Sequence, residues 1–168
     1  MKSIFLHIKN FRFLSAIASI GKNLKDIPLL PIILDEQIKL FTFLFRPFKF
    51  KKMKEFVDEI IRTENLETRY HQYGGIEFHY NGKEIAHMHS NGLLDISFSK
   101  AVRDLLISKK LCEEHHIFPA SGWISFYVNS KSDLQIPFQL IRWSKQLKTK
   151  IKSTSQVLEE INDFKKSL

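Results

Sequence analysis

Four histidines and one aspartate in the middle of the chain have the residue types of a metal site. His87 and His89 are two positions apart, and side chains at i and i+2 of a strand point to the same side, as a pair of metal ligands requires. His115, His116 or Asp95 would complete such a site. We take His87, His89 and His115 as candidate metal ligands, and His87, His89, Asp95 and His116 as candidate catalytic residues.

Two other interpretations of these histidines remain open. In one they are half-buried and hydrogen-bonded, linking a sheet to the following loop; in the other they bind an organic ligand or exchange protons without a metal. The strand register bears on this choice. If Asn81-Gly82 forms the turn of a hairpin, His87 and His89 project to the apolar face under the helices and Asp95 to the opposite face. One β-bulge is then needed to bring the three together.

Polar and aromatic residues on the opposite face have the composition of a ligand pocket, with a solvated sheet face as the alternative. Arg103, one turn into the following helix, is expected to pair with Asp95 or to bind an anionic ligand. Ser121, His116 and Asp95 are together the residue types of a nucleophilic triad, but Ser121 does not lie in a Gly-x-Ser-x-Gly motif. The candidate ligand-binding residues are Glu77, Glu84, Asp95, Arg103, Ser121, Trp123 and Tyr127.

The order of the expected elements defines the fold class. Residues 53–63, 100–110 and 133–150 have helical spacing of apolar residues, and Ser99 is placed to cap the second of these helices. Alternating runs predict strands at 76–80, 83–88, 93–98 and 123–128, with residues 112–122 as an irregular loop. The sequence therefore predicts an α+β fold of two layers. Its sheet is mainly antiparallel and four-stranded, in the order α-β-β-β-α-β-α, with helices on one face.

Composition divides the chain into three parts. Residues 1–53 form a basic, Phe-rich arm that is expected to be helical after Pro31, residues 54–147 form the α+β domain, and residues 148–168 form an amphipathic helical tail. The arm holds ten Lys and Arg against three acidic residues, or +7 of the net charge of +8. Residues 54–144 hold ten basic and twelve acidic residues, or −2. A nearly neutral domain argues against nucleic-acid binding.

The arm has the residue types of a membrane-binding segment. Residues 39–52 mix phenylalanines with lysines and an arginine, as interfacial segments do; the alternative is that the rings cover the domain and the cations are solvated. The expected partner of residues 1–53 is an anionic membrane surface or a protein. The lone Cys112 predicts a cytoplasmic protein, the lack of an 18-residue uncharged apolar run argues against a spanning helix, and the arm makes peripheral membrane association an expectation. Export stays open, because Ala16-Ile17-Ala18 resembles a cleavage site.

Several segments resemble, in order and spacing, the core pattern of the luciferase-like domain family, which is distinct from the flavin-dependent luciferase barrel. They are residues 83–89 (KEIAHMH), 94–96 (LDI) with Phe98, 102–104 (VRD), 115–119 (HHIFP) and 121–126 (SGWISF). The resemblance implies a small α+β domain and no particular substrate, cofactor or catalytic residue. The chain has no flavin or nucleotide motif, and a divalent metal is the one cofactor its residues suggest.

We therefore expect an uncharacterised domain that binds a small ligand or a partner. The alternatives are a metal-dependent enzyme centred on His87 and His89, and a peripheral membrane or protein-interaction module that acts through the basic aromatic arm.

Overall fold

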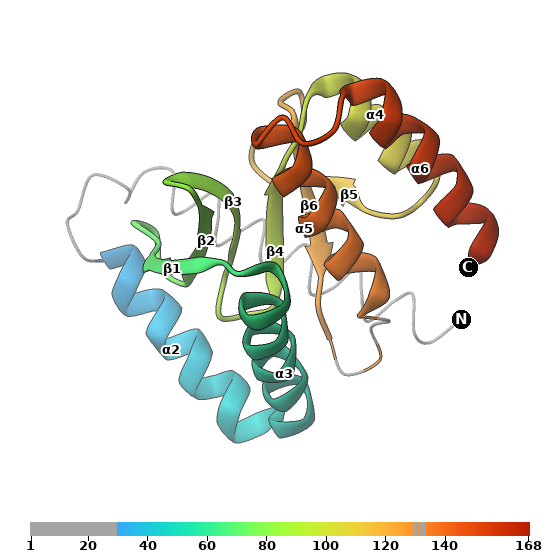
Figure 1. Ribbon diagram of the computed structural model, residues 1–168. Coiled ribbons are helices and arrows are strands. Elements are labelled where there is room, and N and C mark those ends of the chain that lie inside the picture. Colours follow the sequence, from blue (N-terminus) through green and yellow to red (C-terminus); the bar gives the residue numbers. More distant parts are fainter. Residues whose placement is uncertain (1–29, 130, 132–133) are drawn as a thin grey trace.

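The computed structural model describes residues 30–129, 131 and 134–168 as helices packed on one antiparallel sheet. Features expected within residues 1–29, including Ala16-Ile17-Ala18, lie outside this range. The helices are α2 (Leu30–Phe45), α3 (Pro47–Glu64), α4 (Lys100–Ser108), α5 (Gln135–Lys148) and α6 (Thr154–Ser167). The strands are β1 (Glu67–Tyr70), β2 (Ile76–Tyr80), β3 (Lys83–Met88), β4 (Leu93–Ser97), β5 (Glu113–Glu114) and β6 (Trp123–Tyr127). Figure 1 shows their arrangement.

The sheet confirms the predicted α+β class but is larger than predicted. Within the described residues it has six strands in the order β1-β2-β3-β4-β6-β5, all pairing antiparallel, where four were expected. The two additional strands lie at the edges. β1 is exposed at all four positions and β5 is two exposed glutamates long, so neither has the alternation of apolar residues that signals a strand.

The hydrophobic core lies between one face of this sheet and the helices. Phe78, Ala86, Ile96 and Ile124 form a cross-strand row from β2 to β6, and each is fully buried. In Figure 1, α3 and α5 lie over the same side of the sheet, with α4 and α6 together near β5. The core residues that helices α3 to α6 contribute are Phe56, Ile60, Val102, Leu106, Leu140, Ile141, Trp143, Val157 and Ile161.

Helix ends follow the local sequence. Ser99 caps α4 as predicted, its hydroxyl accepting a hydrogen bond from the Val102 N–H. Ser153 and Gln156 form a capping box at the start of α6. α3 begins at Pro47, whose fixed φ suits a first helical position. The boundaries proposed at residues 53 and 147 stay predictions.

A β-bulge changes the register that the hairpin sequence suggests. Next to the turn, His79 lies opposite Glu84 as expected, but Phe78 then lies opposite Ala86, so that Ile85 is an extra residue in β3. The ideal register, which put His87 and His89 on the helix face, is therefore wrong beyond the turn. Ile85, Ala86 and Met88 are part of the hydrophobic core. His87 projects away from the helices, on the face that carries Asp95.

Among the described residues, no helix combines the length and the apolar character that crossing a membrane requires.

Candidate metal centre

Four imidazoles surround the carboxylate of Asp95 on the sheet face opposite the core. Asp95 lies in the middle of β4 between His87 of β3 and Ser125 of β6, and its side chain is fully buried. Its Oδ2 atom is 3.5 Å from His87 Nε2 and 3.6 Å from His89 Nε2. The same oxygen is 3.7 Å from one ring nitrogen each of His115 and His116, which follow β5. The structure thus brings together all the candidate metal and catalytic residues.

The two oxygens of Asp95 differ in their partners. Oδ1 accepts a hydrogen bond of 2.5 Å from the Ser125 hydroxyl. Oδ2 is buried and has no hydrogen-bond partner, because the four imidazole nitrogens lie beyond ordinary hydrogen-bond length. Two ligands of a tetrahedral metal, each about 2.0–2.1 Å from the ion, are about 3.3 Å apart. Separations of 3.5–3.7 Å therefore suit atoms around an ion better than atoms that bond one another directly.

His87 is held between two carboxylates. Its Nδ1 is 2.7 Å from Glu84 Oε1, a contact that the bulge makes possible by turning residues 84 and 87 to the same face. With Nδ1–H donated to Glu84, the Nε2 atom faces Asp95. A carboxylate behind a histidine in this way fixes the ring and its tautomer, as is common for metal ligands. The ring also stacks on His71, with centroids 4.1 Å apart, and lies beside Trp123.

His115 has a different hydrogen-bond pattern from His87. The ligand atoms of His87, Asp95 and His115 lie within 4.8 Å of one another, so that distance alone makes these three a metal-binding set. However, His115 Nδ1 accepts hydrogen bonds from the backbone N–H groups of Ile117 and Phe118. A neutral imidazole that accepts at Nδ1 carries its proton on Nε2. The Nε2 atom faces Asp95 at 3.7 Å, and this hydrogen-bond pattern favours a supporting position for His115 over ligation of a metal.

His89 and His116 complete the cluster. Both side chains are about one-fifth exposed, which places them between the buried carboxylate and the solvent. His116 Nδ1, the atom that faces Asp95, is buried and has no hydrogen-bond partner. Together with Asp95 Oδ2, it is one of two unsatisfied polar atoms in this cluster. Unsatisfied buried groups are rare in folded proteins, and an absent ion is one of their ordinary explanations.

The protonation states of the cluster favour a cation. Burial lowers the pKa of His89 to about 3 and that of His115 to about 4, so both are neutral at pH 7. Burial also disfavours a charged His87, but its contacts with Asp95 and Glu84 outweigh this and raise its pKa to about 9. Asp95 is buried as well, yet the histidines hold the pKa of its carboxyl well below the usual range. Asp95, Glu84 and a protonated His87 then have a net charge of −1, and a metal bound at His87 Nε2 would replace the proton on that atom.

Two predicted interactions are not formed. Arg103 does not pair with Asp95: it pairs with Asp104 and donates to the carbonyl oxygens of Pro119 and Ser121, which hold the loop before β6. The Ser121 hydroxyl donates to the Phe118 carbonyl and accepts from the Trp123 N–H, so that it stabilises a turn and forms no triad with His116.

The other candidate ligand-binding residues are divided between the cluster and its surroundings. Trp123 lies beside His87 and His115, with ring centroids 5.2 and 6.1 Å away. Glu77 binds His79 on β2, 2.6 Å from its Nε2. Tyr127 lies at the far end of β6, where the Lys49 ammonium is over its ring. Trp123 and Glu84 therefore border the cluster directly, and Tyr127 does not.

Sequence reasoning gave no role to His71 and Ser125. His71 lies in the loop between β1 and β2; it is buried and its ring stacks on His87. Alternation along β6 does put Ser125 on the polar face, but it gives no sign of a hydrogen bond to Asp95. The signal for His71 was compositional: the chain has seven histidines, and six of them occur between positions 71 and 116.

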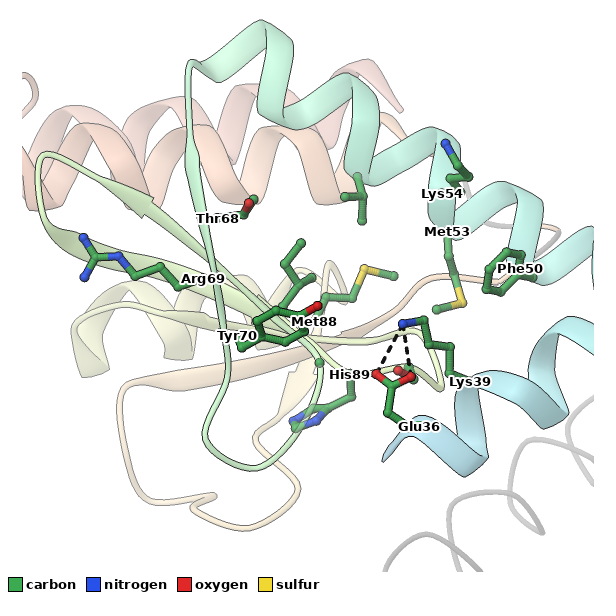
Figure 2. A pocket seen from close by; sticks show the side chains of 14 residues that line it. Glu36, Lys39, Phe50, Met53, Lys54, Thr68, Arg69, Tyr70, Met88 and His89 are labelled. Atoms are coloured by element: carbon green, nitrogen blue, oxygen red, sulfur yellow. Dashed lines mark hydrogen bonds and ion pairs between the residues drawn. The ribbon is translucent and has the colours of Figure 1, made fainter. Parts of the chain in front are cut away.

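A pocket of about 380 Å³ lies apart from the cluster. It is bordered by α2, α3, β1 and the ends of β2 and β3, and Figure 2 shows Met53, Tyr70 and Met88 among its lining side chains. An ion pair between Lys39 and Glu36 lies at one edge. Of the cluster residues only His89 contributes to its lining, and none of the seven candidate ligand-binding residues does.

Fold and site together define a small α+β domain with a carboxylate-centred histidine cluster on its open sheet face. The family model described as the Luciferase domain matches residues 82–144, which confirms the resemblance to the luciferase-like domain family. This range contains Glu84, His87, His89, Asp95, His115 and His116. The comparison with curated proteins found no match. Neither did the comparison with solved structures.

Proposed function

We propose that this luciferase-like domain binds one divalent transition-metal ion at the histidine cluster, and that this metal centre is its functional site. The proposed ligands are Asp95 Oδ2 and His87 Nε2, which belong to one set of closely spaced ligand atoms, together with His89 Nε2 and His116 Nδ1, which would move toward the ion on binding. The observation that carries the proposal is the buried Oδ2 atom, which has no hydrogen-bond partner and four imidazole nitrogens at 3.5–3.7 Å.

The remaining residues have supporting roles in this proposal. Glu84 fixes the orientation of His87, and Ser125 fixes that of Asp95. His115 lies 3.7 Å from the same carboxylate oxygen, with its ring held by the backbone N–H groups of residues 117 and 118. The charge of −1 on Asp95, Glu84 and His87 favours a dication, which would displace the proton of His87 Nε2 but none from neutral His89.

Three imidazoles and one carboxylate suit zinc, iron or manganese rather than the oxygen-seeking calcium and magnesium. Such an ion, when bound, polarises a carbonyl or phosphoryl oxygen or activates a water molecule. Trp123 forms a flat apolar wall beside His87, against which an organic substrate would lie. These features support a metal-dependent enzyme. Binding of a small ligand or a partner without a metal, which the sequence led us to expect first, stays a prediction.

Metal content and affinity test the proposal. The full chain, expressed without a histidine tag, is expected to contain about one zinc, iron or manganese per molecule by plasma mass spectrometry. After chelation it is expected to rebind zinc in isothermal titration calorimetry. Asp95→Asn and His87→Ala are each expected to weaken zinc binding at least ~100-fold, because each removes a ligand. His79→Gln is the matched control: His79 also binds a carboxylate but lies outside the cluster, so its affinity should be that of the wild type.

The same titration separates ligands from supporting residues. His89→Ala and His116→Ala should resemble His87→Ala, whereas His115→Ala and Glu84→Gln should lower affinity only about 10-fold, as is typical of residues behind the ligands. A chain that is folded, free of metal and unable to bind zinc after purification would contradict the proposal. The cluster would then be a network of hydrogen-bonded histidines around a structural aspartate.

A further inference from the structure

α2 turns two polar residues toward the domain and most of its large apolar residues outward. Asp35 and Thr42 are buried, at 5% and 4% exposure. Leu40, Phe41 and Phe45, by contrast, are 54–69% exposed. Surface helices of water-soluble domains normally have the opposite arrangement, with the apolar stripe against the core. The outward face of α2 is therefore unlike that of the other helices and resembles a surface made for an apolar partner.

Hydrogen bonds to the domain explain why α2 is held in this orientation. The Asp35 carboxylate accepts from the backbone N–H of Ser90 at 3.0 Å and from its hydroxyl at 2.5 Å. Asp35 also lies against the loop before β2, where its Cβ atom would be 2.2 Å from a side chain added at Gly74. α2 packs on α3 as well. The helix is thus fixed by a buried polar contact, which leaves its apolar residues on the outside.

The apolar surface continues onto the start of α3. Phe43 and Leu44 of α2 are more than half exposed, and Phe48 of α3 is 81% exposed. The ring of Phe41 contacts that of Phe45, with centroids 4.8 Å apart. We call these residues, with Leu40, the phenylalanine surface: Leu40, Phe41, Phe43, Leu44, Phe45 and Phe48.

Cations border the phenylalanine surface. Lys39, Arg46 and Lys51 are exposed, and Lys52 is half-buried. Between Gln37 and Lys54 the sequence contains no acidic residue. Bulky apolar side chains with lysine and arginine beside them are the composition of helices that lie in the headgroup region of an anionic membrane. A protein partner of matching shape would need acidic groups around an apolar groove, whereas a membrane provides both without such a match.

We propose that α2 and the first turn of α3 form a docking surface for an anionic membrane, into which the phenylalanine surface inserts. This inference is independent of the metal proposal. Docking would also orient the candidate metal centre, because Asp35 of α2 binds Ser90, the residue after His89.

Vesicle binding by the full chain tests the docking surface. The probes are vesicles of phosphatidylcholine alone and of phosphatidylcholine with 30% phosphatidylserine, at about 0.1 M and 0.5 M salt. We expect binding to the anionic vesicles, at least ~10-fold weaker binding at the higher salt, and little binding to neutral vesicles. The triple variant Phe41→Ser, Phe45→Ser, Phe48→Ser should lose at least ~10-fold of this affinity. Tyr70→Ser, which removes an exposed ring from β1, is the control and should bind as the wild type does.

Three results would overturn the proposal. In the first, the wild type does not bind anionic vesicles. In the second, the triple variant binds as tightly as the wild type, which would place the binding on other residues of the chain. In the third, light scattering shows a dimer that the triple variant dissociates and vesicles do not, so that the surface contacts a second copy of the chain. Circular dichroism of each variant confirms that it is folded, and the two single variants Phe45→Ser and Phe48→Ser replace the triple variant if it is not.

Discussion

Ser125→Ala should reduce both the stability of the domain and its affinity for a metal. Ser125 is 4% exposed, and its hydroxyl donates to Asp95 Oδ1 across 2.5 Å in a fully buried pair. A hydrogen bond to a charged group contributes about 1.5–3 kcal/mol, and alanine leaves the buried carboxylate without this donor. The free energy of unfolding should therefore fall by about 2 kcal/mol. For a chain of this size, that loss lowers Tm by about 4–8 °C.

The metal affinity supplies the second measurement. Without Ser125 the Asp95 carboxylate is free to rotate, and zinc affinity in calorimetry should fall about 10-fold. Ser144→Ala is the matched control. Ser144 is equally buried, but its hydroxyl donates to the carbonyls of Ile85 and Ser97 from the helix side. It should lose about 1 kcal/mol of stability and keep the zinc affinity of the wild type. Stability is measured by thermal unfolding in the presence of a chelator, so that bound metal does not contribute.

Two results would contradict this prediction. If Ser125→Ala has the Tm and zinc affinity of the wild type, Asp95 does not depend on its hydrogen bond and the account of Oδ1 is wrong. If Ser144→Ala weakens zinc binding as much as Ser125→Ala does, the effect is a general loss of stability and says nothing about the cluster.

Three further predictions concern the surroundings of the cluster. Gly75→Ala should lower the free energy of unfolding, measured in urea, by more than ~2 kcal/mol, because φ is +91° and the new Cβ would be 2.3 Å from the Met88 carbonyl oxygen. Gly82→Ala, where no atom lies near the new Cβ, should lower it by only about 1 kcal/mol. Burial lowers the pKa of Lys49 to about 8, so that between pH 8 and 10 this lysine holds more protons in the unfolded chain than in the folded one. The free energy of unfolding should therefore rise with pH over this range, by about 2 kcal/mol more in the wild type than in Lys49→Met. Arg103→Lys should lower zinc affinity several-fold, because a lysine ammonium does not reproduce the guanidinium hydrogen bonds that hold the loop before β6. If that variant binds zinc as tightly as the wild type does, the loop does not depend on these hydrogen bonds.

Alternation predicted most of the sheet, and it failed where the backbone departs from regular pairing. Asn81-Gly82 correctly predicts the turn, and the strands around it have the expected bounds within a few residues. A bulge was named only as the condition for bringing His87, His89 and Asp95 together, and its position at Ile85 was not predicted. Two consecutive apolar residues, Ile85 and Ala86, between polar Glu84 and His87 are the local sign of it, since both enter the core while their neighbours share the other face.

The sequence patterns did not predict the edge strands or the contacts between residues far apart in the chain. β1 and β5 pair with their neighbours through backbone hydrogen bonds, and their side chains are exposed. Their sequences therefore lack the apolar alternation of a strand with one buried face. The residue types of the cluster were predicted, because histidines and an aspartate are unusual together in a small domain. Their convergence depends on the bulge and on a loop that returns His115 and His116 to β4. The spacing of apolar residues along the sequence predicts neither of these features.

Anomalous diffraction from crystals grown with zinc, collected on both sides of the zinc absorption edge, tests the metal centre most directly. We expect one strong peak about 2.0–2.2 Å from Asp95 Oδ2 and from His87 Nε2, with His89 and His116 completing the coordination. The Asp95→Asn variant should lack this peak. A peak found only at the Glu77 and His79 pair, or density for an ordered water at Asp95 Oδ2 with no anomalous signal, would contradict the account.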